Sequence, residues 1–155
     1  MPRSLVCLAL TLLAPSMAPA QLATRPTLTL AAVKQIVNAA EAEAVRNNWS
    51  VSIAVVDEHG ELLAFRRMDG TSFASVEVSQ AKARTAARFR TPTKALADRL
   101  TAGALVLLSI DGVALLQGGL PITVNGTVIG AIGVSGVTSE QDEMTAAAGI
   151  AALRR

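Results

Sequence analysis

The order of apolar and polar positions predicts one helix near the beginning of the chain and another near its end. From Thr29, apolar residues recur at steps of three and four with charged residues between them, which is the period of an amphipathic helix ending near Asn47. Towards the other end, Thr138 and Gln141 form a capping-box pattern, and acidic residues follow where the helix dipole favours them. We therefore expect a helix at each end of the folded region.

Short β-branched and apolar runs between these helices predict an antiparallel sheet. Residues 51–56 and 61–68 flank a polar turn and form one hairpin, whereas residues 122–124 and 128–134 flank Asn125-Gly126, whose residues tolerate the positive φ of a type I′ turn. Residues 113–116 are expected to add a strand. Glycines at 130 and 133 interrupt the last run, which indicates that another part of the molecule approaches the backbone there.

The middle of the chain predicts two further helices. Residues 73–89 carry an apolar stripe of mostly small side chains that favours close packing on another element, formed by Ala74, Val78, Ala81 and Phe89. Pro92 ends this helix and residues 93–100 form a shorter one, while residues 103–110 fit either a strand or a buried helix. Helices around antiparallel strands indicate an α+β fold with a single domain over residues 29–155, either three-layered or with helices on both faces of the sheet.

The first twenty residues have the pattern of a secretory signal peptide. A basic start precedes an apolar run, and small residues occupy positions 18 and 20, so cleavage before Gln21 is expected, followed by a flexible arm over residues 21–28. The apolar run is too short for a transmembrane segment, and a buried N-terminal strand or helix is the alternative. The mature protein is then expected to be periplasmic or secreted.

Composition narrows the classes of function. The net charge of +2 is dispersed, and the chain has one Trp and no Tyr, which argues against a nucleic-acid surface. Cys7 leaves with the signal, and His59 is the sole histidine, so a zinc site of histidine and cysteine ligands is not expected. His59 lies in a hairpin turn, where we expect an exposed side chain that is a poor buried axial ligand for haem.

Two groups of residues are candidates for chemistry. Arg67 and Asp69 end a strand and Lys82 lies in the next helix, so the three residues are expected to form one site. There the arginine could bind a carboxylate through two hydrogen bonds, and the lysine could act as a base or form an imine. The structural alternative is that Lys82 pairs with Asp69, Glu77 or Glu58. Gly118, Gly119 and Ser135 are candidate cofactor-binding residues, because exposed backbone N–H groups can cradle an anion, although a strand bulge explains the glycines as well.

The segment 118–153, with the motifs RMDG at 67–70 and KARTA at 82–86, resembles the GlcG/HbpS family, a domain also found at the C-terminus of PduO-type proteins. The resemblance implies an antiparallel profilin-like sheet flanked by helices, association with haem and assembly into homo-oligomers. Some members bind haem through a histidine near the start of the domain, which the first helix here lacks.

Three hypotheses follow. The first is a secreted or periplasmic oligomer that binds a small ligand, with haem as the implied cofactor. The second is a catabolic enzyme, a lyase or isomerase that transfers a proton on a small carboxylate or carbonyl compound with Arg67, Asp69 and Lys82. The third is a structural module for assembly.

Overall fold

The computed structural model describes residues 24–154. The predicted signal peptide lies outside the described residues. The elements follow one another along the chain as α1 (Leu30–Arg46), β1 (Ser52–Asp57), β2 (Leu62–Arg67), α2 (Ala74–Phe89), α3 (Thr93–Thr101), η1 (Leu105–Ser109), β3 (Gly119–Val124), β4 (Thr127–Ser135), α4 (Ser139–Ala151) and η2 (Ala152–Arg154), where η marks a 3-10 helix.

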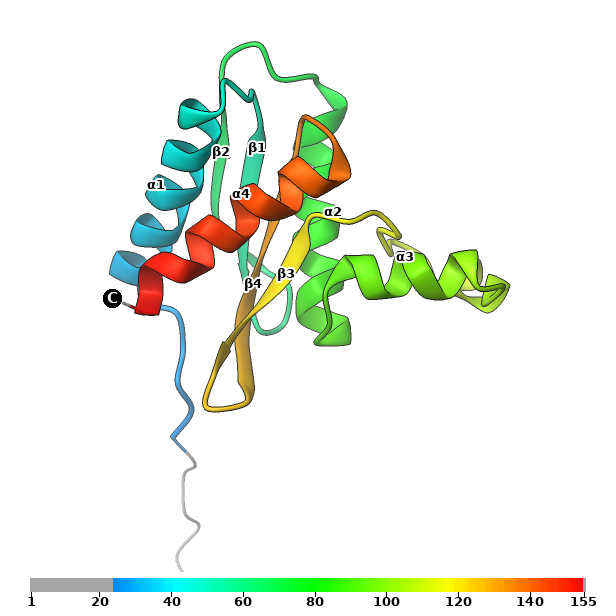
Figure 1. The fold of residues 1–155 in the computed structure, drawn as a ribbon. Coiled ribbons are helices and arrows are strands. Elements are labelled where there is room, and N and C mark those ends of the chain that lie inside the picture. Colours follow the sequence, from blue (N-terminus) through cyan, green and yellow to red (C-terminus); the bar gives the residue numbers. More distant parts are fainter. Residues whose placement is uncertain (1–23, 155) are drawn as a thin grey trace, which may run out of the picture.

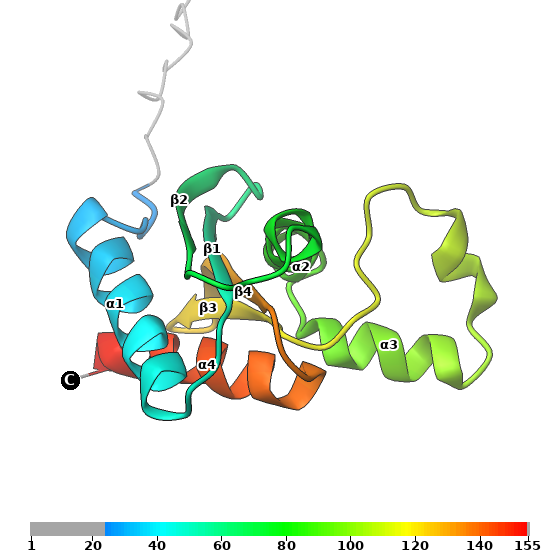
Figure 2. The same cartoon turned by 90° about the horizontal axis from the view of Figure 1, so that it is seen from above.

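The four strands form one antiparallel sheet in the order β2-β1-β4-β3. Helices α1 and α4 lie on one face and α2 lies on the other, so the domain has three layers (Figures 1 and 2). This arrangement confirms the predicted α+β class with helices on both faces of the sheet. Both predicted hairpins are present, and the pairing of β1 with β4 joins them into a single sheet.

The larger part of the core lies between the sheet and the helices α1 and α4. Branched aliphatic side chains dominate it, among them Ile36, Ile53 and Ile132, which are fully buried. The two helices begin as predicted, because the Thr29 side chain accepts a hydrogen bond from the Ala32 N–H and the capping box of Thr138 and Gln141 is formed. Leu28 packs against this core, so the end of the predicted arm is anchored.

The other face of the sheet is covered by α2 at close range. A Cβ built at position 133 would lie 2.1 Å from the Ser79 carbonyl oxygen, which confirms that the glycine is there to admit the backbone of another element. The predicted stripe on α2 is wrong, since Ala74 and Phe89 are exposed. The buried residues are Ser75, Ser79, Lys82, Ala83, Thr85, Ala86 and Ala87. Such a close approach leaves room mainly for small side chains, and the long side chain of Lys82 is the exception among these buried residues.

Between α2 and β3 the chain forms an arm that projects away from the sheet in both views (Figures 1 and 2). It contains α3 and η1, so the ambiguous stretch 103–110 is a short 3-10 helix rather than a strand. The strand predicted at 113–116 is wrong: this stretch is irregular, and the Ala114 N–H donates to the Thr85 side chain instead of to a neighbouring strand. The apolar run alone therefore misassigned residues 113–116, whereas the helix predicted at 93–100 is confirmed by α3.

The helices within residues 24–154 include none with the length and apolar character needed to cross a membrane.

Candidate functional site

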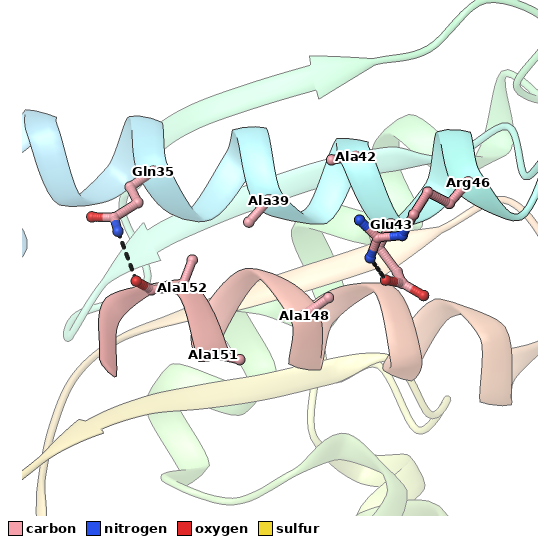
Figure 3. Close-up of a pocket in the computed structure, with 8 residues that line it drawn as sticks. All are labelled: Gln35, Ala39, Ala42, Glu43, Arg46, Ala148, Ala151 and Ala152. Atoms are coloured by element: carbon pink, nitrogen blue, oxygen red, sulfur yellow. Dashed lines mark hydrogen bonds and ion pairs between the residues drawn. The ribbon is translucent and has the colours of Figure 1, made fainter. Parts of the chain in front are cut away.

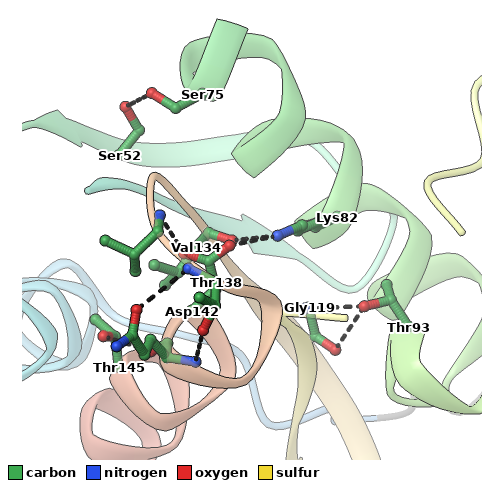
Figure 4. Close-up of polar contacts among 11 residues, drawn as sticks. Ser52, Ser75, Lys82, Thr93, Gly119, Val134, Thr138, Asp142 and Thr145 are labelled. Carbon is green, nitrogen blue, oxygen red and sulfur yellow. Dashed lines mark hydrogen bonds and ion pairs between the residues drawn. The ribbon is translucent and has the colours of Figure 1, made fainter. Parts of the chain in front are cut away.

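Lys82 is the centre of a network of buried polar contacts between α2, β4 and α4, and its side chain is only 2% exposed. Its Nζ donates to the Asp142 Oδ2 at 2.8 Å and to the Val134 carbonyl oxygen at 2.9 Å (Figure 4). The predicted pairing of Lys82 with Asp69, Glu77 or Glu58 is therefore wrong. The true partner lies 60 residues further along the chain, at the start of α4, and only the folding of α4 onto the sheet brings it close.

Asp142 is equally enclosed, and each of its carboxylate oxygens has a partner. While Oδ2 accepts from Lys82, Oδ1 accepts from the Val137 N–H at 3.2 Å. Burial raises the pKa of Asp142 above its ordinary value, and the hydrogen bond and charge of Lys82 oppose this rise. The pair thus ties α2, the end of β4 and α4 together.

Gly118 and Gly119 lie directly against this ion pair. A Cβ at position 118 would be 2.8 Å from the Lys82 Nζ, and one at position 119 would be 2.5 Å from the Lys82 carbonyl oxygen. The Gly119 N–H donates to the Thr93 side chain at 3.0 Å, so this N–H already has an acceptor inside the protein (Figure 4). The two glycines therefore permit close packing over Lys82.

Ser135 is half-buried at the end of β4, opposite Ser52 in the sheet. The Ser52 hydroxyl is 2.8 Å from the hydroxyl of Ser75 on α2, which continues the polar row on the buried side of that helix. Ser135 and Gly118 thus belong to neighbouring regions beneath α2.

Arg67 and Asp69 lie at the surface, at the end of β2 and in the turn that follows. The Arg67 guanidinium donates to the Thr71 carbonyl oxygen at 2.7 Å, and its carbon lies 4.5 Å from the centre of the Phe73 ring, a cation–π contact. The structure therefore does not join these two residues to the buried amine of Lys82. Arg67 is exposed, whereas the amine of Lys82 is enclosed and paired with Asp142.

A groove of about 500 Å³ runs between α1 and α4 (Figure 3). Its floor is made of alanines, and Gln35 closes one end by donating to the Ala152 carbonyl oxygen at 2.7 Å. An ion pair of Arg46 with Glu43 lies at the other end. This groove could not be predicted from the sequence, because alanines at helical spacing are typical of buried helix faces.

A second hollow, of about 350 Å³, is polar and contains the sole histidine. Its walls are Thr24, Arg25, Pro26, Glu58, His59, Arg90, Thr127 and Val128. The His59 side chain is 72% exposed, as its position in a turn predicted. This cleft went unnoticed in the sequence because its walls come from four separated segments. We refer to it below as the arginine cleft.

Residues 24–154 contain no group of three or more histidine, cysteine or acidic side chains placed to hold a metal ion.

Comparisons with known proteins extend this description. The family model for haem-degrading proteins like HbpS matches residues 28–151. GlcG of Escherichia coli K12 is 42% identical over 112 residues, which are 72% of this chain and 84% of that protein. The crystal structure of HbpS is 38% identical with a TM-score of 0.80, covering 86% of this chain and 94% of that one. A crystal structure of a PduOC:haem complex is 30% identical with a TM-score of 0.77, covering 82% and 95%. This chain therefore belongs to the HbpS-like family.

Proposed function

We propose that this protein binds haem or a related small ligand after export, and that it acts as a homo-oligomer. The observation that carries the proposal is the relation to the haem complex of PduOC, whose fold this chain shares over most of its length at 30% identity. The match of the HbpS-like family model to residues 28–151 supports the same ligand class.

The side chains of this chain suit a haem that is bound through its porphyrin ring and its propionates rather than through its iron. The chain has one histidine, one cysteine before the described region and no tyrosine, and the His59 imidazole is exposed. Met68 packs against the core and Met144 is exposed. Bound haem supplies an iron centre with redox and oxygen chemistry. We infer that this chain contributes porphyrin contacts and cations for the propionates rather than a buried axial ligand.

The arm between α2 and β3 supports the proposed assembly. Leu105, Val106 and Leu108 are 66%, 70% and 64% exposed, and they lie on a segment that projects from the sheet. Grouped exposed aliphatic side chains are typical of protein interfaces, because water disfavours a continuous apolar patch. Assembly without a ligand is the second candidate function, and this arm is the observation that favours it.

The proton-transfer hypothesis has no such support. Lys82 is enclosed and its amine is hydrogen-bonded to Asp142 and Val134, while Arg67 and Asp69 lie at the surface. A general base must reach the proton that it removes. The geometry therefore does not favour proton transfer by these residues.

Quenching of the fluorescence of Trp49, the sole tryptophan, tests the proposal. The protein is titrated with haemin and, separately, with iron-free protoporphyrin. We expect saturable quenching by both compounds with affinities that differ by less than about tenfold, because an iron–ligand bond is not the main source of affinity. Unsaturable quenching by both would contradict ligand binding, and binding of haemin alone would contradict the inferred mode.

A further inference from the structure

We propose that the arginine cleft is a binding site for carboxylate groups, with Arg25 and Arg90 as the residues that hold them. This inference deepens the proposed function, because the propionates of haem are carboxylates, but it rests on that function only for the source of the carboxylate. A free small acid has the same chemistry. The cleft brings together the N-terminal segment, the turn between β1 and β2, the end of α2 and the start of β4.

The charges around the cleft leave its two arginines without acidic partners. Glu61 lies 4.0 Å from Arg88, and the Glu58 carboxylate is 3.7 Å from the His59 Nε2. Asp57 accepts the backbone N–H groups of His59 and Glu61, both at 2.9 Å. By contrast, within residues 24–154 neither Arg25 nor Arg90 forms an ion pair.

Arg90 occupies a backbone position that favours glycine. It follows the last residue of α2 with φ of 53° and ψ of 35°, in the left-handed region, and its N–H donates to the Ala87 carbonyl oxygen. A side chain in this region costs energy that glycine avoids, and such residues occur often at functional sites. Arginine at this position directs a long cationic side chain to the rim of the cleft, which glycine cannot do.

The wall of the cleft that the turn between β1 and β2 forms is held in a fixed shape by hydrogen bonds. The Arg88 Nε donates to the His59 carbonyl oxygen at 3.1 Å, which ties the turn between β1 and β2 to α2. The two bonds accepted by Asp57 close the same turn. A preformed wall lowers the entropy lost on binding. Arginine binds carboxylates through two parallel N–H···O bonds, so two arginines suit a ligand with two or more carboxylates.

Equilibrium titrations with citrate, haemin and haemin whose propionates are esterified test the inference at constant ionic strength. The variants are Arg25→Gln and Arg90→Gly, and the control is Arg99→Gln, an exposed arginine on α3 whose loss changes the net charge equally. We expect each cleft variant to lose at least about tenfold in affinity for a carboxylate ligand, since a hydrogen bond to a charged group is worth that much. The thermal midpoint of Arg90→Gly should stay equal or rise, because glycine relieves the left-handed backbone.

The outcomes separate the two sources of carboxylate and the two proposals. Loss of haemin affinity in the variants, with esterified haemin insensitive to them, identifies propionates as the ligand. Loss of citrate affinity alone identifies a free acid and leaves haem binding to another surface. If the cleft variants bind both compounds as Arg99→Gln does, the inference is overturned, even where wild-type protein binds haemin and the proposed function stands. Wild-type protein that binds neither citrate nor haemin overturns the inference as well.

Discussion

Replacing Lys82 by methionine tests the energetics of the buried ion pair. The substitution keeps most of the side-chain volume and removes the amine, so Asp142 loses its partner while it stays 2% exposed. Breaking a buried pair by removing one member typically costs about 3–5 kcal/mol, because the remaining charge has neither solvent nor counter-ion. Domains of this size are stable by about 5–15 kcal/mol in total, so the loss should be large.

Urea denaturation followed by circular dichroism measures this loss. The double variant Lys82→Met with Asp142→Asn should recover a substantial part of it, since both charges then leave together. The matched control is Lys94→Met, which breaks the exposed pair of Lys94 with Asp98 and should change stability little. Equal unfolding midpoints for Lys82→Met and wild type would refute the argument that this pair is enclosed and mutually dependent.

The pH dependence of the stability of Lys82→Met provides an independent test of the ion pair. Burial raises the pKa of Asp142 in the folded state, and removing Lys82 raises it further. When the pKa of a carboxyl is higher in the folded state, its protonation stabilises the folded state. This contribution to the free energy of unfolding is fully present at pH values below the ordinary pKa of 3.8, and it is lost as the pH rises through the pKa of the folded state. The deficit of Lys82→Met relative to wild type should therefore shrink as the pH falls from about 7 towards 3.8. A loss of stability that grows as the pH falls would contradict the interpretation that an unpaired Asp142 carboxylate destabilises Lys82→Met.

Three further predictions concern packing, assembly and export. Gly133→Ala should lower the free energy of unfolding by about 1–3 kcal/mol, because its Cβ would meet the α2 backbone, and unchanged thermal melting would refute this. Leu105→Ser combined with Leu108→Ser should reduce the mass measured by light scattering during gel filtration, whereas a wild-type monomer would contradict the proposed assembly. N-terminal sequencing of exported protein should begin at Gln21, and a retained Met1 would contradict the predicted signal.

Local signals in the sequence were sufficient for much of the fold. The turn at Asn125-Gly126 and the capping box of Thr138 and Gln141 each depend on neighbouring residues, and both appear where they were expected. Gly133 correctly predicted that another element approaches β4 closely. The periodicity of α2 did not show which face of this helix packs against the sheet. Alanine and serine are common on both buried and exposed faces, so the larger Val78 and Phe89 were misleading.

The candidate site was harder to predict because its contacts span long stretches of chain. Lys82 and Asp142 are 60 residues apart, and no spacing rule links a residue of α2 to one of α4. A lysine among small residues on a helix face is the one signal that pointed to burial with a distant acidic partner. The arginine cleft gives an even weaker signal, since Arg25 and Arg90 come to line one cleft only once the chain has folded.

An absorbance titration of the purified protein with haemin tests ligand binding most directly. We expect a Soret band that shifts from that of free haemin and saturates at a fixed ratio of haemin to chain. Saturation should persist in His59→Ala within about threefold in affinity, because the exposed imidazole is not the main contact. A spectrum that grows in proportion to added haemin, without a shift or an end point, would contradict the proposal that this protein binds haem.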